Sequence, residues 1–198
     1  MKKILIYGAR TLGKHIKNLI SECNYEFSGF ISDIDKDSNI LGSYNEIKSS
    51  YIPSEYAITL GIGYTDIRNR QIIYDKVIND GYEVISLVHP NAFISKNSSI
   101  GQGAVIFPGT IIDYNVTIEP LVLIYSGAVI GHDSFIGKNT IISLNSTVCG
   151  FANIVGNSLI GAGSVIVDKV KLPEYSFVKA GKVYSLSSSK DKEVVQKL

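Results

Sequence analysis

An apolar residue recurs at every sixth position over more than a third of the chain, and this spacing constrains the fold more than any other feature. The series consists of twelve isoleucines and one valine: Ile94, Ile100, Ile106, Ile112, Ile118, Ile124, Ile130, Ile136, Ile142, Val148, Ile154, Ile160 and Ile166. A second series, four residues later, holds only small or β-branched residues: Ser98, Ala104, Thr110, Val116, Val122, Ala128, Ser134, Thr140, Ser146, Ala152, Ser158, Ser164, Val170 and Ser176. A period of six fits neither a helix nor a single strand, so it predicts short strands joined at tight corners.

Three such strands make one triangular coil, in which residues 18 apart share a corner and the isoleucines point inward. Successive coils stack at ~4.8 Å, so residues 91–184 form a parallel β-helix of about five coils and roughly 24 Å. Four glycines directly follow an isoleucine and are expected to give the corners backbone freedom: Gly101, Gly131, Gly137 and Gly161. The polar residues 185–198 are expected to form a C-terminal tail that leaves the β-helix as a short helix or a frayed end.

Residues 1–90 have a different pattern, in which strand-like and helix-like segments alternate. The predicted strands are Ile4–Tyr7, Phe27–Ile31, Tyr56–Leu60 and Val84–Val88. The predicted helices run from Leu12 to Cys23 and from Ile67 to Asn79. This alternation predicts a small α/β domain with a parallel, Rossmann-like sheet, in which residues 34–55 have no clear assignment.

The composition excludes several classes of protein. A net charge of +1 over 198 residues argues against nucleic acid or an anionic membrane as a partner. Every apolar run is far shorter than the roughly 20 residues of a membrane span. Cys23 and Cys149 are expected to be free thiols in a reducing cytoplasm, and no Cys/His cluster has the spacing of metal ligands.

The segment "YGARTLG" joins the first strand to the first helix, where backbone N–H groups can meet a phosphate. It lacks the middle glycine of a dinucleotide fingerprint, because Arg10 stands there, which argues against NAD. Asp33 follows the second strand, where an acid commonly meets a ribose or a base. A plain strand–helix turn with solvated acids explains the same pattern.

His132 is the candidate catalytic residue. Since Ile130 points inward, His132 belongs to the next corner and projects outward, where an imidazole can act as a base near neutral pH. His15 lies on the flank of a helix, and His89 precedes a proline, where a structural hydrogen bond is expected. Asp133 either orients the imidazole or caps backbone N–H groups of the turn.

Gly150 lies 18 residues after His132, and therefore one coil further along the same corner. Its N–H is positioned to donate to the oxyanion of a tetrahedral intermediate, although a glycine required only by the turn would look the same. Ala162 and Ala180 are also 18 residues apart, on a different corner.

The hexapeptide series, together with "ILIYGARTLG", "GFISD", "LGIGYTDIRNR", "VHPNAFIS" and the Gly-His-Asp at 131–133, resembles a family of bacterial acyltransferases. These are left-handed parallel β-helix enzymes, in the branch of sialic acid O-acetyltransferases and N-acetyltransferases of nucleotide-linked 4-amino sugars. The resemblance implies a homotrimer that binds acetyl-CoA between neighbouring β-helices. It also implies roles for individual residues: His132 as general base, Gly150 as oxyanion donor, Ala162 and Ala180 at the pantetheine arm, and Arg10, Thr11, Leu12, Asp33 and Gly63 at the nucleotide sugar.

Three functions follow as hypotheses. The first is acetyl-CoA-dependent N-acetylation of a nucleotide-linked amino sugar for surface polysaccharide or glycan synthesis. Direct transfer is expected, because the nearby Cys149 has no evident activator. The second is O-acetylation of a sialic acid or another glycan hydroxyl. The third is an inactive β-helix scaffold, which Leu12 and Ile141 keep open because related amino-sugar enzymes can carry histidines there.

Overall fold

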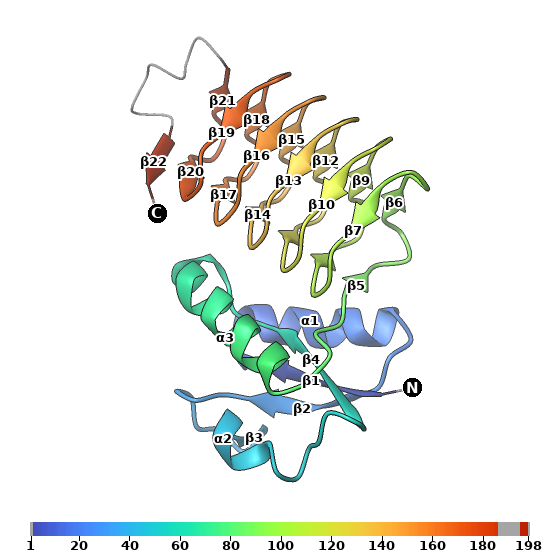
Figure 1. Ribbon diagram of the computed structural model, residues 1–198, viewed down its shortest axis with the longest axis vertical. Helices are drawn as coiled ribbons and strands as arrows, with labels where there is room; N and C mark the ends of the chain where they lie inside the picture. Colours follow the sequence, from blue (N-terminus) through green and yellow to red (C-terminus); the bar gives the residue numbers. More distant parts are fainter. Residues whose placement is uncertain (1, 186–194, 198) are drawn as a thin grey trace. The chain divides into compact units, whose positions relative to one another are not determined.

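The computed structural model describes residues 2–185 and 195–197 of the chain. Two compact units divide the molecule, Met1–Leu87 and Val88–Leu198. The first is an α/β unit and the second is a parallel β-helix (Figure 1).

The α/β unit is built on one parallel sheet, sheet A, with the strand order β3-β2-β1-β4. Its strands are β1 (Lys3–Tyr7), β2 (Phe27–Ile31), β3 (Ile40–Gly42) and β4 (Tyr56–Leu60). Its helices are α1 (Thr11–Glu22), α2 (Tyr44–Ile47), the 3-10 turn η1 (Tyr64–Asp66) and α3 (Ile67–Asn79). The apolar face of α1 is buried through Ile16, Leu19 and Ile20, as its periodicity predicts.

Two parts of this unit differ from the sequence prediction. The unassigned region 34–55 contains β3 and α2, and the short helix α2 begins with a capping box between Ser43 and Glu46. The predicted strand Val84–Val88 is only partly correct: Val84 makes an isolated parallel bridge to Ile58, and the chain between Val84 and Leu87 is not a strand. The remaining pair, Leu87–Val88, is β5 and belongs to a sheet of the β-helix. A short apolar run does not reveal which sheet its backbone will join.

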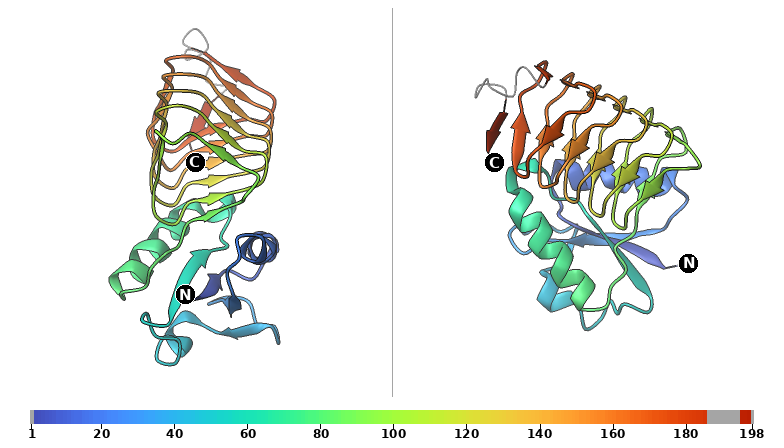
Figure 2. Two further views of the ribbon diagram at one scale, coloured as in Figure 1. Left: turned by 90° about the vertical axis from the view of Figure 1, so that its right-hand side faces the viewer. Right: turned by 45° about the horizontal axis from the view of Figure 1, so that its top comes forward.

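Three parallel sheets form the β-helix, and each coil contributes one short strand to each sheet (Figure 2). Sheet B contains β5, β8 (Val105–Ile106), β11 (Leu123–Ile124), β14 (Ile141–Ile142), β17 (Leu159–Ile160), β20 (Ser176–Val178) and β22 (Val195–Lys197). Sheet C contains β6 (Phe93–Ile94), β9 (Ile111–Ile112), β12 (Val129–Ile130), β15 (Thr147–Val148), β18 (Val165–Ile166) and β21 (Val183–Tyr184). Sheet D contains β7 (Ser99–Ile100), β10 (Thr117–Ile118), β13 (Phe135–Ile136), β16 (Asn153–Ile154) and β19 (Lys171–Leu172).

The end of the chain adds one antiparallel strand, since β22 pairs with β20 at the edge of sheet B. The sequence predicts a short helix or a frayed tail over 185–198, and within this range residues 195–197 form that strand. Most of this predicted tail, residues 186–194 and 198, lies outside the described residues.

The isoleucine series forms the interior of the β-helix. Each strand pairs in register with the strands one coil before and after it, so that Ile136 lies between Ile118 and Ile154. Ile136 is fully buried, as are most members of the series, and the small residues of the second series lie beside them in the same core. Both sequence series therefore fill the interior, and the prediction of a β-helix is confirmed.

The corner glycines have a different function from the one predicted. Gly131 and Gly161 are not in the left-handed region of backbone space; instead, each passes close to the next coil. A Cβ on Gly131 would lie 2.9 Å from the amide nitrogen of Gly150, and one on Gly161 would lie 2.5 Å from that of Ala180. The left-handed corner positions mostly carry side chains, including Asn115, Asp133, Asn139, Asn145 and Asn157. Asparagine and aspartate tolerate this conformation better than other residues with side chains.

The interior ladder can be tested at Ile136. We expect Ile136→Ala to reduce the free energy of unfolding by about 2–5 kcal/mol, because it leaves a cavity between two neighbouring isoleucines. Ile136→Val, the matched control, should cost only about 0.5–1.5 kcal/mol. Chemical denaturation measures both values, and equal, small losses would contradict a close-packed interior at this coil.

Candidate active site

His132 lies on the corner that joins β12 of sheet C to β13 of sheet D, and its side chain is 49% exposed. The coils stack here in strict register. The Phe151 N–H donates to the His132 carbonyl oxygen over 3.0 Å, and the Lys169 N–H donates to the Gly150 carbonyl oxygen over 3.1 Å. His132, Gly150 and Asp168 therefore follow one another along a single corner, as the 18-residue spacing predicts for the first two.

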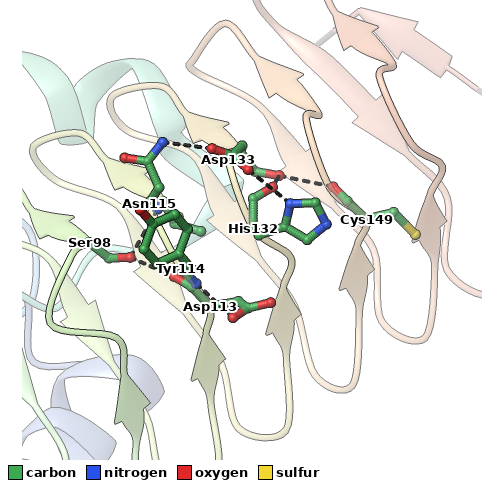
Figure 3. A network of polar contacts seen from close by, with 9 residues as sticks. Ser98, Asp113, Tyr114, Asn115, His132, Asp133 and Cys149 are labelled. Atoms are coloured by element: carbon green, nitrogen blue, oxygen red, sulfur yellow. Dashed lines mark hydrogen bonds and ion pairs between the residues drawn. The ribbon is translucent and has the colours of Figure 1, made fainter.

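Asp133 turns back toward His132 although the two residues are adjacent in the chain (Figure 3). Asp133 has a φ of 56°, and this left-handed conformation brings its Oδ2 within 2.9 Å of the His132 Nδ1. The hydrogen bond to Asp133 is the main cause that raises the pKa of His132, and the charges of Asp113 and Asp168 add to it. The Asn115 amide and His132 lower the pKa of Asp133. The structure thus brings together two residues whose side chains tend to diverge.

Gly150 makes room for the imidazole. A Cβ on Gly150 would lie 2.9 Å from both Cε1 and Nε2 of His132, and 3.3 Å from Oδ1 of Asp168. The ring of Phe151 meets the imidazole edge-on, with centroids 5.1 Å apart. Among the described residues, the Gly150 N–H has no backbone acceptor, and the residue itself is buried.

Ala162 and Ala180 lie on another corner, between the strands of sheet B and those of sheet C. The Gly181 N–H donates to the Ala162 carbonyl oxygen over 2.8 Å, which fixes the two alanines one coil apart. Within one chain, sheet C separates this corner from that of His132. The predicted contact of both alanines with a pantetheine arm remains a prediction.

The thiol of Cys149, which precedes Gly150 in the chain, is a poor nucleophile. Burial and the charge of Asp168 raise the pKa of the Cys149 thiol, which disfavours the nucleophilic thiolate.

His89 accepts a hydrogen bond at Nδ1 from the Asn91 N–H over 2.9 Å, so its predicted structural hydrogen bond is confirmed. The sequence analysis missed Asp113 and Asp168. The same register would have found Asp168, 36 positions after His132.

In the α/β unit, the glycine loop lies at the point where the strand order of sheet A reverses. The chain moves from β1 to β2 and β3 in one direction, and β4 then pairs on the opposite side of β1. Ligands of open parallel sheets bind at the carboxyl ends of the strands at such a point. Gly8 and Gly61 follow β1 and β4, and a Cβ on Gly8 would lie 2.7 Å from the Gly61 carbonyl oxygen. A Cβ on Gly61 would in turn lie 2.7 Å from the Cα of Gly13, so these glycines allow three backbone segments to meet.

The predicted substrate residues of this unit occupy different environments. Arg10 is exposed and forms a two-pronged salt bridge with Asp35, with nitrogen–oxygen distances of 2.9–3.1 Å, and the guanidinium lowers the pKa of that carboxyl group. The sequence analysis missed Asp35. Thr11 is the exposed first residue of α1, and Leu12 is buried. Gly63, which follows β4 in the chain, is half-buried.

Asp33 is held by the protein itself. Its Oδ2 accepts a hydrogen bond from the Tyr7 hydroxyl, and its Oδ1 accepts one from the Tyr44 N–H over 2.8 Å. Burial and Asp33 together raise the pKa of Tyr7. Asp33 thus links the end of β1 to the start of α2, and its predicted contact with a ribose or base stays a prediction.

The described residues contain neither a group of metal-binding side chains nor a membrane-spanning helix. No group of three or more His, Cys, Asp or Glu side chains in this part of the chain is arranged to hold a metal ion. None of the helices described is long and apolar enough to cross a membrane.

Two family models match the chain, one for each unit. The model described as the GMPPB C-terminal domain matches residues 83–194, more than half of the chain. The chain belongs to this family. The model described as the PglD N-terminal domain matches residues 3–77.

Similar proteins support the same assignment. The GDP-perosamine N-acetyltransferase of Escherichia coli O157:H7 is 25% identical over 166 residues, which are 81% of this chain and 73% of that protein. The solved structure of PerB from Caulobacter crescentus, in complex with CoA and GDP-perosamine, has a TM-score of 0.85 at 20% identity, with 93% of this chain and 89% of that chain covered. The acetyltransferase domain of PglB from Neisseria gonorrhoeae has a TM-score of 0.59 at 21% identity, with all of both chains covered. The predicted fold and family resemblance are confirmed.

The His132–Asp133 pair predicts the effect of one substitution on the imidazole pKa. Asp133→Asn removes the charge and the strongest acceptor at Nδ1, so the raised pKa of His132 should fall toward that of a free histidine. NMR titration measures this directly, because the chain has only three histidines. An unchanged His132 pKa would mean that the contact does not persist in solution.

Proposed function

We propose that this protein is an acetyl-CoA-dependent N-acetyltransferase of a nucleotide-linked amino sugar, with His132 as general base. The observation that carries the proposal is the His132 corner. An exposed imidazole is bonded at Nδ1 to Asp133 and lies against Gly150, whose N–H has no backbone acceptor in the part of the chain that the structure describes. The similar E. coli and C. crescentus proteins are named as acetyltransferases of GDP-perosamine or perosamine, which supports this substrate class.

The proposed reaction is a direct transfer. The Nδ1–H of neutral His132 donates to Asp133, so the lone pair is on Nε2, which accepts a proton as the amine nitrogen attacks the thioester carbonyl. A carbon–nitrogen bond forms, and the Gly150 N–H donates to the resulting oxyanion. Collapse breaks the carbon–sulfur bond, and the imidazolium returns the proton to the departing coenzyme A sulfur. The raised pKa of Cys149 supports a route without an acyl-enzyme.

The charges around His132 favour an amine acceptor over a sialic acid. The charged groups that raise the His132 pKa are all carboxylates, namely Asp113, Asp133 and Asp168. Lys169 follows Asp168 on the same corner and leaves a net negative charge there. The amino group approaches as an ammonium ion, which this field attracts, and it releases one proton to solvent before the neutral amine attacks. The carboxylate of a sialic acid is repelled at the same place.

The remaining roles follow from the two units. In the first, the loop after β1, with Arg10, Thr11 and Leu12, together with Asp33 and Gly63, would bind the nucleotide. In the second, Ala162 and Ala180 would contact acetyl-CoA. The product would enter the synthesis of a surface polysaccharide or glycan. We place the enzyme in the cytoplasm, where acetyl-CoA is available and the thiols of Cys23 and Cys149 stay reduced.

The proposed assembly is a homotrimer formed through sheet C. The outward positions of this sheet are apolar except for one threonine: Phe93, Ile111, Val129, Thr147, Val165 and Val183. Phe93, Ile111 and Val183 are 61%, 43% and 58% exposed in the single chain, and Val129 and Val165 between them are partly exposed. A continuous apolar strip of this kind is typical of an interaction surface. Most outward positions of sheet D are polar, by contrast. Association about a threefold axis along sheet C would bring the His132 corner of one chain to the Ala162 corner of the next.

The base assignment predicts that His132→Ala lowers kcat by ~10²–10⁴ with little change in stability, because the side chain is exposed. His15→Ala, an exposed histidine on α1, is the control and should keep wild-type activity. Thiol release from acetyl-CoA with GDP-perosamine as the first acceptor provides the assay. An unchanged kcat for His132→Ala would remove the base assignment.

The choice between the alternatives requires a panel of acceptors. Nucleotide-linked amino sugars, free sialic acid and polymeric glycans are compared in the same assay. Thiol release with a sialic acid or a glycan hydroxyl alone would favour the O-acetyltransferase. A chain that does not bind coenzyme A in calorimetry would favour the inactive scaffold.

The proposed interface predicts the effect of a charge on sheet C. Ile111→Glu places a carboxylate on the apolar surface and should convert a trimer into single chains. Thr117→Glu makes a similar change on sheet D and should leave the trimer intact. Light scattering coupled to gel filtration gives the masses. A wild-type mass of one chain, or a trimeric Ile111→Glu, would contradict this interface.

A further inference from the structure

The contact between His132 and Asp133 depends on a residue from the preceding coil. Asn115 lies 18 residues before Asp133, and its Nδ2 donates to the Asp133 Oδ1 over 2.6 Å (Figure 3). The two residues have nearly the same left-handed backbone conformation, with φ of 55° and 56°. Because they occupy equivalent positions of successive coils, their side chains lie one above the other.

The two oxygens of the Asp133 carboxylate therefore have different partners. Oδ1 accepts from Asn115, and Oδ2 faces the His132 Nδ1 at 2.9 Å. A carboxylate held at one oxygen cannot rotate without breaking that hydrogen bond, so the other oxygen remains directed at the imidazole. Exposed charged pairs normally lose much of their interaction to side-chain freedom. Asn115 removes this freedom from Asp133.

The coil that carries Asn115 is itself fixed. The Ser98 Oγ donates to the Asp113 carbonyl oxygen over 2.5 Å and accepts from the Val116 N–H over 2.9 Å, so it ties the two ends of this corner together. The Asp133 N–H also donates to the Tyr114 carbonyl oxygen over 2.9 Å. Backbone and side chain of Asp133 are thus both bound to residues 113–116.

We propose that Asn115 is a positioning residue for His132 that acts through Asp133. With Oδ2 of Asp133 fixed at Nδ1, the proton of the neutral imidazole stays on Nδ1 and the basic lone pair stays on Nε2. Nε2 is one of the two ring atoms that lie against Gly150. The hydrogen bond of Asn115 therefore selects which imidazole nitrogen is the base. The catalytic part of this inference rests on the proposed function, whereas its structural part does not.

The chain contains a second asparagine pair between coils that serves as the control, although this pair is buried whereas Asn115 is exposed. Asn139 and Asn157 are also 18 residues apart, both in the left-handed conformation, and are linked Nδ2 to Oδ1 over 2.8 Å. This pair lies on the corner between sheets D and B and continues to Glu174 instead of a histidine. Loss of an asparagine hydrogen bond between coils can therefore be separated from loss of the contact to His132.

The test replaces each asparagine by glycine, which adopts the left-handed conformation without strain. In Asn115→Gly, NMR titration should show the His132 pKa falling toward its value in Asp133→Asn, with a smaller share of the Nδ1–H tautomer in the imidazole nitrogen shifts. Asn139→Gly should leave both readouts as in the wild type. If Asn115→Gly does not fold, Asn115→Ser replaces it in the test, because a serine side chain is shorter than asparagine and does not reach Asp133.

A double-mutant cycle decides whether Asn115 acts through Asp133. In the Asp133→Asn background, Asn115→Gly should have no further effect on the His132 pKa or on turnover. In the wild-type background, Asn115→Gly should lower kcat about tenfold and leave the KM for acetyl-CoA unchanged. Tenfold is the lower end of the effect expected when a residue that orients a site residue is lost. Wild-type titration in Asn115→Gly, or equal effects in both backgrounds, would overturn the proposal. A chain that acetylates no amino sugar would overturn the proposed function, while the titration would still decide the role of Asn115.

Discussion

The rest of the structure depends on the backbone hydrogen bonds that repeat between coils. These bonds surround an interior filled by the continuous isoleucine ladder. Each strand is only two or three residues long, so no strand is stable alone, and the register is set by neighbours one coil away. The ladder permits one spacing, and that spacing fixes which residues share a corner. His132, Gly150 and Asp168 lie together because the interior isoleucines cannot change register without exposing themselves.

The sequence was sufficient to predict most of the β-helix and the position of His132, because both follow from the period of six. It was also sufficient for β2, β4 and α3, whose bounds agree with the prediction residue for residue. It was not sufficient for the segment Val84–Val88, where apolar character does not reveal the pairing partner. Region 34–55 contains short elements held by local caps and tertiary contacts, which leave little periodicity to detect.

The candidate site shows a similar division. The 18-residue spacing predicted that Gly150 follows His132 on one corner, and the structure has this arrangement. The convergence of Asp133 on His132 depends on a left-handed φ, which no spacing rule contains. It also depends on Asn115, which the 18-residue spacing places beside Asp133, although the spacing does not reveal the hydrogen bond between them. The glycines at 131 and 161 were expected to supply conformational freedom, whereas their function is close approach between coils. Backbone conformation and interatomic space are properties of the folded chain, and residue types alone leave several possibilities open.

Between Phe93 and Tyr184 the strands follow one another every six residues, with no inserted segment. A β-helix without insertions has no flap of its own to fold over a bound molecule. Any enclosure of a reactant must then come from side chains a residue or two away from a strand, or from another polypeptide surface. Exchange of reactants at such a corner would need no opening of a loop, and its rate would be set by how well neighbouring surfaces fit together.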